Sequence, residues 1–90
     1  MVILKSPREI EKIRRSNQMV AEILYELRKQ VTPGVDTLTL DRISEEMAIK
    51  QKAKPAFKGY RGFPFSLCAS VNEQVVHGFP SKVPLKEGDI

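Results

Sequence analysis

The chain has 90 residues, of which 41% are hydrophobic and 29% charged, and its net charge is +4. This length gives one small domain or part of a larger one, whose core buries only about 60–65% of the surface of the unfolded chain. No apolar run approaches the ~20 residues that a membrane span needs, and a single cysteine excludes an internal disulfide. With no secretory signal at the start, these features favour a cytoplasmic protein without a membrane partner.

The basic excess does not predict a dedicated nucleic-acid site. Lys and Arg alternate with Glu and Asp along both helical stretches, as on ordinary solvated faces. The densest basic cluster, Lys50, Lys52 and Lys54, lacks the interleaved aromatic side chains on which bases stack. We therefore expect no sequence-specific nucleic-acid partner, although a basic surface favours transient contact with ribosomal RNA.

A first helix is predicted to begin after Ser6 and to stop at Pro33-Gly34. Ser6 can cap it, Pro7 suits the first helical position, and Glu9 completes a capping box. Apolar residues then recur at steps of three and four, which indicates a stripe that faces a core more often than a partner protein. The stripe consists of Ile10, Ile13, Val20, Leu24, Leu27 and Val31.

A second, shorter helix is predicted from the cap at Asp36 and Thr37 to about Lys50. Leu40, Ile43 and Met47 form its apolar side, so the simplest interpretation is a helix that covers the core. The charged residues Asp41, Arg42, Glu45 and Glu46 are expected on its other faces.

The loop 59–64 contains two glycines, a proline and two aromatic residues, which predicts a constrained turn with an apolar face. Farther on, 67–71 and 75–76 are short apolar runs on either side of a polar break, a pattern typical of a strand, a tight turn and a second strand. The second run ends at His77, the only histidine, directly before Gly78. On residue chemistry alone, a lone histidine here is more often hydrogen-bonded and structural than catalytic.

Four sequence motifs alter that balance, because together they resemble the type I methionine aminopeptidases. They are GYRGFP at 59–64, CASVNE at 68–73, VHGFP at 76–80 and KEGDI at 86–90. The family pattern is G-Y-x-G-[YF]-P, S-x-N-E, V-x-H-G-[IVF]-P and x-x-G-D-[IV], in this order and at this spacing. The resemblance extends back through the helical part, so it covers essentially the whole chain.

The resemblance implies a catalytic role for His77, which would donate a hydrogen bond to the substrate backbone rather than bind metal. It also places Tyr60, Phe63 and Cys68 in the pocket for the first side chain of the substrate. Phe63 stands where the family often has tyrosine, so any hydrogen bond from that hydroxyl would be absent. A polarizable side chain such as Cys68 suits contact with a methionine thioether, whereas no nearby base supports Cys68 as a nucleophile.

The family hydrolyses peptides with two divalent metal ions, which can be cobalt, manganese, iron or zinc, held by two aspartates, a histidine and two glutamates. In the family all five ligands follow the Gly-Asp-Ile turn, so the resemblance implies no metal ligand among these 90 residues, and Asp89 is not assigned as one. We therefore expect no metal bound by this chain alone.

The implied fold class is α+β: the first half of a pita-bread fold, with two helices packed on a curved antiparallel sheet truncated at the C-terminus. Residues 1–90 would form a single incomplete domain, the N-terminal half of a catalytic domain, and the exposed sheet edge would favour self-association. The implied function is removal of the N-terminal methionine from nascent proteins by the full-length parent, with this chain inactive alone. The alternatives are a non-catalytic binding protein on the same fold, acting in protein or ribosome interaction, and an unrelated α+β interaction domain.

Overall fold

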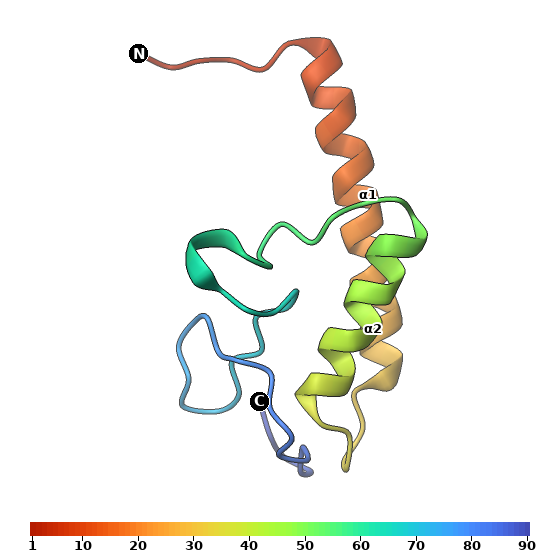
Figure 1. Ribbon diagram of the computed structural model, residues 1–90, viewed down its shortest axis with the longest axis vertical. Helices are drawn as coiled ribbons and strands as arrows, with labels where there is room; N and C mark the ends of the chain where they lie inside the picture. The colour runs from red at the N-terminus through yellow and green to blue at the C-terminus, as the bar shows by residue number, and fades with distance from the viewer.

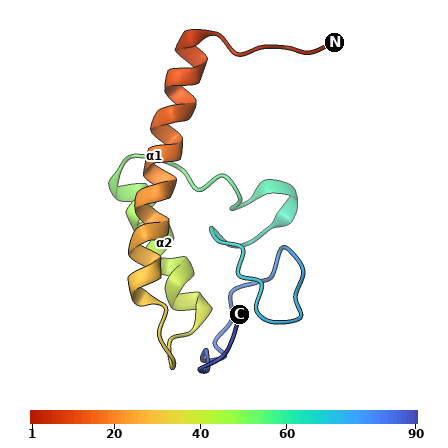
Figure 2. The ribbon, with the colours of Figure 1, turned by 180° about the vertical axis from the view of Figure 1, so that it is seen from behind.

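Two helices and a short 3-10 turn are the regular elements of the chain. The computed structural model describes all 90 residues and contains α1 (Pro7–Gln30), α2 (Thr37–Lys50) and η1 (Tyr60–Gly62). Figure 1 shows α2 alongside the C-terminal half of α1, while the first residues extend away from the other end of α1. Apart from η1, the chain after α2 is irregular and lies beside the helices, as the reverse view in Figure 2 also shows.

The start of α1 is fixed by the predicted capping box. The Ser6 hydroxyl accepts the Glu9 N–H at 3.2 Å, and the Glu9 carboxylate accepts the Ser6 N–H at 2.9 Å. Pro7 occupies the first turn, where its missing N–H leaves no helical bond unmade. The helix ends before Pro33-Gly34, and Gly34 has a φ of +99°. The helix therefore begins where predicted and ends at Gln30, ahead of the predicted stop.

The N-terminus of α2 binds a distant turn as well as its own cap. The Asp36 carboxylate accepts the Thr39 N–H at 2.7 Å, which confirms the predicted cap. The Thr37 hydroxyl accepts the Ser81 N–H at 2.8 Å, and the Leu38 N–H donates to the Ser81 carbonyl at 3.1 Å. Since the first amides of a helix have no partner inside it, this turn satisfies one of them.

The core is small and lies between the two helices. Its buried side chains are Leu27 of α1 and Leu40 and Ala48 of α2, and Pro80 is the one other buried apolar residue. Of the apolar stripe expected to face a core from α1, Leu27 alone is buried, and the remaining members are exposed. Part of this uncovered surface lines an apolar groove of about 390 Å³ between α1, α2 and residues 53–57.

The predicted α+β fold class, with helices packed on a curved antiparallel sheet as half of a pita-bread fold, is wrong for this chain. The structure has no strand, only an isolated antiparallel bridge between Asp36 and Pro84. The two runs expected to pair share no backbone hydrogen bond. The bond nearest to such a pairing lies just beyond the second run, from the Ala69 N–H to the Gly78 carbonyl at 2.9 Å.

The absence of a ladder has a local reason. Asn72 and His77 have φ values of +55° and +56°, which interrupt the extended conformation on both sides of the second run. Between them, Val75 and Val76 are 88% and 65% exposed. A two-stranded hairpin is marginal on its own, and the only backbone hydrogen bond from a third segment is the one from the Asn72 N–H to the Ile90 carbonyl at 2.6 Å. The chain therefore has no sheet edge of the kind expected.

Neither helix combines the length with the apolar character needed to cross a bilayer.

Candidate functional site

The four phenylalanines of the chain form one cluster that joins the loop 59–64 to the segment after His77. The Phe63 ring lies edge-on to Phe79 with centroids 5.3 Å apart, and Phe65 also meets Phe79, at 5.4 Å. Phe57 adds a further edge contact to Phe63 at 6.3 Å. Edge-to-face geometry is a favoured arrangement of aromatic rings. The cluster therefore joins Phe63 to Phe79, which lies two residues after His77 along the chain.

Tyr60 lies on a tight turn that presents its ring to solvent. Gly59 and Gly62 have φ values of +85° and +81°, which glycine adopts readily, and the Gly59 N–H donates to the Phe63 carbonyl at 2.7 Å. Tyr60 is 61% exposed and contacts the Arg61 guanidinium, which lies 5.3 Å from the ring centroid. The turn thus separates Tyr60 from the aromatic cluster while keeping it on the same loop as Phe63.

Cys68 is a half-buried free thiol on the segment that faces Gly78. Its neighbour Ala69 donates its N–H to the Gly78 carbonyl, so the chain around Cys68 runs beside the chain around His77. The structure therefore draws three of the predicted site residues, Phe63, Cys68 and His77, toward one region through the contacts of Phe79 and Gly78.

His77 is exposed and has a left-handed backbone conformation, with φ at +56°. Its imidazole makes no hydrogen bond within the chain, so both ring nitrogens are available to an outside partner. Gly78, by contrast, is buried, and its N–H donates to the Ser70 hydroxyl at 2.9 Å. The His77 imidazole is therefore open to an outside hydrogen-bond partner, while the backbone of the next residue is held in place.

The buried carboxylate of Asp41 anchors the same region to α2. One oxygen of Asp41 accepts the Ser66 N–H at 2.8 Å and the Leu67 N–H at 2.9 Å. The sequence placed Asp41 on an outer face of its helix, since aspartate is seldom buried. Polar loop backbone that has no strand partner needs another acceptor, and that need was the only signal that could have pointed to Asp41.

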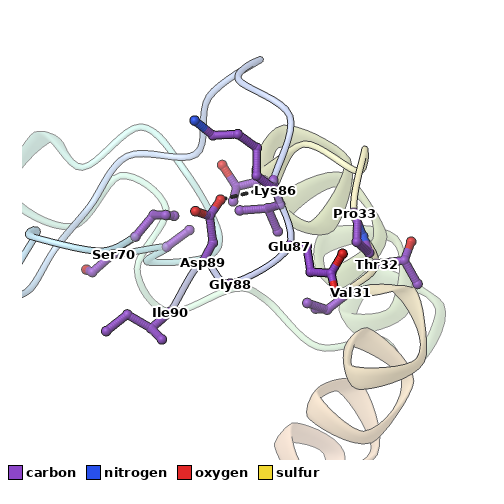
Figure 3. Close-up of a pocket in the computed structure, with 13 residues that line it drawn as sticks. Val31, Thr32, Pro33, Ser70, Lys86, Glu87, Gly88, Asp89 and Ile90 are labelled. Atoms are coloured by element: carbon purple, nitrogen blue, oxygen red, sulfur yellow. Dashed lines mark hydrogen bonds between the residues drawn. The ribbon is translucent and has the colours of Figure 1, made fainter.

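A cavity of about 410 Å³ opens beside this region, between the end of α1 and the C-terminal turn (Figure 3). The Asp89 carboxylate, which lines the cavity, is already paired: it accepts the Lys86 N–H at 2.8 Å and the Asn72 side-chain N–H at 3.1 Å. These two bonds, the first being the stronger influence, lower the pKa of Asp89. Tyr60, Phe63, Cys68 and His77 do not line this cavity. Its lining residues are Val31, Thr32, Pro33, Thr37, Ala69, Ser70, Val71, Leu85, Lys86, Glu87, Gly88, Asp89 and Ile90.

No group of three or more His, Cys, Asp or Glu side chains gathers closely enough to hold a metal ion. Asp89, the acidic residue nearest the C-terminus, is committed to hydrogen bonds with Lys86 and Asn72. The residues of this chain therefore do not fit a metal centre.

Comparison with known proteins gives consistent matches along the chain. Residues 11–90 match the profile described as Metallopeptidase family M24. The chain is 51% identical over 90 residues to methionine aminopeptidase of Clostridium perfringens and 49% identical to methionine aminopeptidase 1 of Bacillus subtilis. Each alignment covers 100% of this chain and 36% of the relative, so the chain spans about a third of the length of these relatives.

Solved structures agree with the sequence relatives. The crystal structure of methionine aminopeptidase from Thermotoga maritima superposes with a TM-score of 0.94 at 44% identity, over 99% of this chain and 36% of that one. The enzyme from Rickettsia prowazekii gives the same TM-score at 35% identity and the same coverage. The path of this irregular chain is therefore one that also occurs within larger folded proteins.

Proposed function

Because the chain belongs to metallopeptidase family M24, as its resemblance to the type I methionine aminopeptidases predicted, we propose that it contributes to removal of the N-terminal methionine from nascent proteins. Residues 1–90 would be one incomplete domain, the N-terminal portion of a longer catalytic domain. The support for this proposal is the identity of 49–51% to relatives of that name, of whose length the chain covers 36%.

The observation that carries the proposal is the state of His77. Its ring is exposed and free of hydrogen bonds, while the next residue is buried and fixed. A positioned imidazole can donate a hydrogen bond to a peptide group on which negative charge develops, which lowers the barrier to hydrolysis. We assign this role to His77.

Substrate binding is proposed for Tyr60, Phe63 and Cys68. Phe63 is packed among the other phenylalanines next to the His77 segment, and Cys68 lies beside the same segment. Apolar and sulfur-containing side chains suit a methionine side chain, since both are apolar and polarizable. The substrate class is accordingly a peptide or nascent protein that begins with methionine.

Divalent metal ions belong to the chemistry of a metallopeptidase, and cobalt, manganese, iron and zinc are the candidates. The acidic and histidine side chains of this chain do not assemble a site for them. We therefore limit the part of this chain to contacts with the peptide, and the proposal places the metal ligands in residues outside these 90.

Three further properties are proposed from surface character. The protein would act in the cytoplasm, where nascent chains are made. Its net charge of +4 supports transient contact with ribosomal RNA. The exposed apolar residues of α1 and of the segment 75–76 support self-association when no other chain covers them.

The test is a chimera in which these 90 residues replace the matched segment of the Clostridium perfringens relative. The exchange is sterically reasonable because the chain is 51% identical to this relative and superposes with a TM-score of 0.94 on the Thermotoga maritima structure. Release of methionine from a Met-Ala-Ser peptide is then measured with manganese or cobalt, beside the 90-residue chain alone. We expect activity in the chimera and none in the short chain.

His77→Ala in the chimera should abolish most turnover without loss of bound metal, because the ring would act on substrate. Val75→Ala, a change of an exposed side chain two residues earlier, is the matched control and should leave turnover intact. A folded, metal-loaded chimera without activity would refute the catalytic proposal and leave the non-catalytic binding function as the interpretation.

A further inference from the structure

His77 adopts a backbone conformation that residues other than glycine rarely take. Its φ of +56° lies in the left-handed region, where the Cβ atom crowds the neighbouring carbonyl. Residues of this kind persist only where surrounding contacts fix them. Neither the ring nor the N–H of His77 makes such a contact, because both lack a hydrogen-bond partner in the chain.

The contacts that could fix His77 belong to the next residue. The Gly78 N–H donates to the Ser70 hydroxyl at 2.9 Å, and the Gly78 carbonyl accepts the Ala69 N–H at 2.9 Å. Gly78 also lies so close to this segment that an added Cβ would sit 2.7 Å from the Ser70 Cα. Gly78 is therefore held against residues 69–70 through both its N–H and its carbonyl, and the N–H belongs to the peptide group that follows His77.

The Ser70 bond acts on His77 because of how peptide groups are built. The N–H of Gly78 lies in the rigid plane that begins at the Cα of His77, so its direction is set by ψ of His77. A hydroxyl that accepts this N–H restricts that rotation. Without the hydroxyl, this restraint on ψ is lost, and the backbone of His77 can relax toward the negative φ values that an L-residue prefers.

We propose that Ser70 is a positioning residue, which holds His77 in its left-handed conformation through the Gly78 N–H and so aims the imidazole. The importance of this orientation for catalysis rests on the proposed function, whereas the effect of Ser70 on the backbone of His77 does not. The Ser70 side chain contacts neither the ring nor any of the three proposed substrate-binding residues through a hydrogen bond, so its effect passes entirely through the backbone.

The experiment compares the isotope-labelled full chain with its Ser70→Ala and Ser70→Thr variants by NMR. The sign of φ at His77 is read from backbone couplings, and the exchange rate of the Gly78 amide is read in deuterated water. We expect a positive φ and a protected Gly78 amide in the parent and in S70T, which keeps the hydroxyl. In S70A we expect φ at His77 to become negative and the Gly78 amide to exchange about tenfold faster.

Ser6→Ala is the matched control, since it also removes a serine hydroxyl that accepts a backbone N–H, but at the start of α1. It should leave φ at His77 and exchange at Gly78 unchanged. A positive φ at His77 and a fully protected Gly78 amide in S70A would overturn the assignment. A negative φ and faster Gly78 exchange in S6A would overturn it too, because the effect would then reflect a general loss of stability.

If S70A fails to fold, Ser70→Cys decides, because a thiol is a weaker acceptor. Faster exchange of Gly78 in S70C would support the role of Ser70, and unchanged exchange would refute it. All of these readings are independent of turnover. An inactive chimera would contradict the proposed function while leaving the positioning role of Ser70 to be judged by the NMR data alone.

Discussion

Asp41 of α2 and Ser66, 25 residues later, are joined by a hydrogen bond of 2.8 Å from the Ser66 N–H to one carboxylate oxygen. The same oxygen accepts the N–H of Leu67. No strand supplies partners for this loop, so a helix side chain does so instead. The attachment fixes the start of the segment that leads to Cys68 and Ser70.

Replacement of Asp41 by alanine should lower the free energy of unfolding by about 2–3 kcal/mol, because two backbone N–H groups in a partly buried site lose a charged acceptor. Asp41→Asn keeps one oxygen acceptor and should lose only about 1 kcal/mol. Urea unfolding followed by circular dichroism measures both. Glu46→Ala, which removes an exposed ion pair with Arg42 on the same helix, should change stability by less than about 0.5 kcal/mol. Equal effects of D41A and E46A would rule out the anchoring role.

Phe63 is the ring with the most partners in the aromatic cluster, since it meets Phe57, Phe65 and Phe79. Phe63→Ala should reduce stability by about 2 kcal/mol, less than for a fully buried ring, because the side chain is half-buried. A double-mutant cycle with Phe79→Ala should give a coupling energy of about 0.5–1.5 kcal/mol.

Tyr60→Ala is the control for the cluster, because Tyr60 lies on the same loop but outside these ring contacts. Its effect on stability should stay within about 0.5 kcal/mol. A coupling energy near zero between Phe63 and Phe79 would show that the cluster does not hold the loop against the His77 segment.

The helices could be predicted because their signals are local. The capping box of Ser6 and Glu9 and the cap of Asp36 each join residues three positions apart, and each forms as the spacing indicates. Burial along α1 was not predictable in this way. A periodic stripe reports which face is apolar, but only neighbouring segments decide whether it is covered, and here they cover Leu27 alone.

The motifs named candidate residues for the site but gave no indication of the contacts that support them. The motifs singled out His77 as a candidate, whereas the hydrogen bonds that hold the segments around it come from Asp41 and Ser70. Their partners lie 25 and 8 residues away, respectively. The expected strands failed for a similar reason, since alternation and branched residues favour extended backbone, but a ladder requires a partner segment with matching amides.

Stability should fall in acid because three carboxyl groups have a lowered pKa. The pKa of Glu9 is lowered mainly by a hydrogen bond from the Ser6 N–H. That of Asp36 is lowered by hydrogen bonds from the Thr39 side chain and then from the Thr39 N–H. That of Asp89 is lowered by hydrogen bonds from the Lys86 N–H and then from the Asn72 side chain. A folded-state pKa below the unfolded value means that the unfolded chain binds more protons as pH falls. The stability that these three carboxylates contribute is therefore fully present above the ordinary pKa values of 4.5 for glutamate and 3.8 for aspartate. It is lost as the pH drops through the lowered pKa values of the folded chain.

Urea unfolding at about pH 7, 5, 4 and 2.5 should show little change down to about pH 5 and a decline below about pH 4. Asp36→Asn should flatten the decline because it removes one of the titrating groups, whereas Glu22→Gln, at a side chain without a hydrogen bond, should not. A decline of equal size in the parent and D36N would exclude the Asp36 cap as a source of acid sensitivity.

Gly78→Ala should destabilise the chain by about 2–3 kcal/mol because the new Cβ meets backbone rather than a movable side chain. Its nearest neighbours are the Ala69 carbonyl and the Ser70 Cα, and neither can shift without breaking the hydrogen bonds to Gly78. Amide shifts of residues 69, 70 and 77 should therefore move together in the variant.

Gly34→Ala provides the comparison, because a Cβ there meets nothing within 4 Å but the φ of +99° is strained for alanine. It should cost about 1–2 kcal/mol and leave the shifts of residues 69, 70 and 77 unchanged. Adding Ala69→Gly to G78A tests the origin of the clash, since it removes a side chain that the new Cβ does not touch. If the double variant regained stability, the backbone clash would be contradicted. If it stayed as unstable as G78A, the clash would lie with backbone atoms, and only glycine would fit between His77 and Phe79.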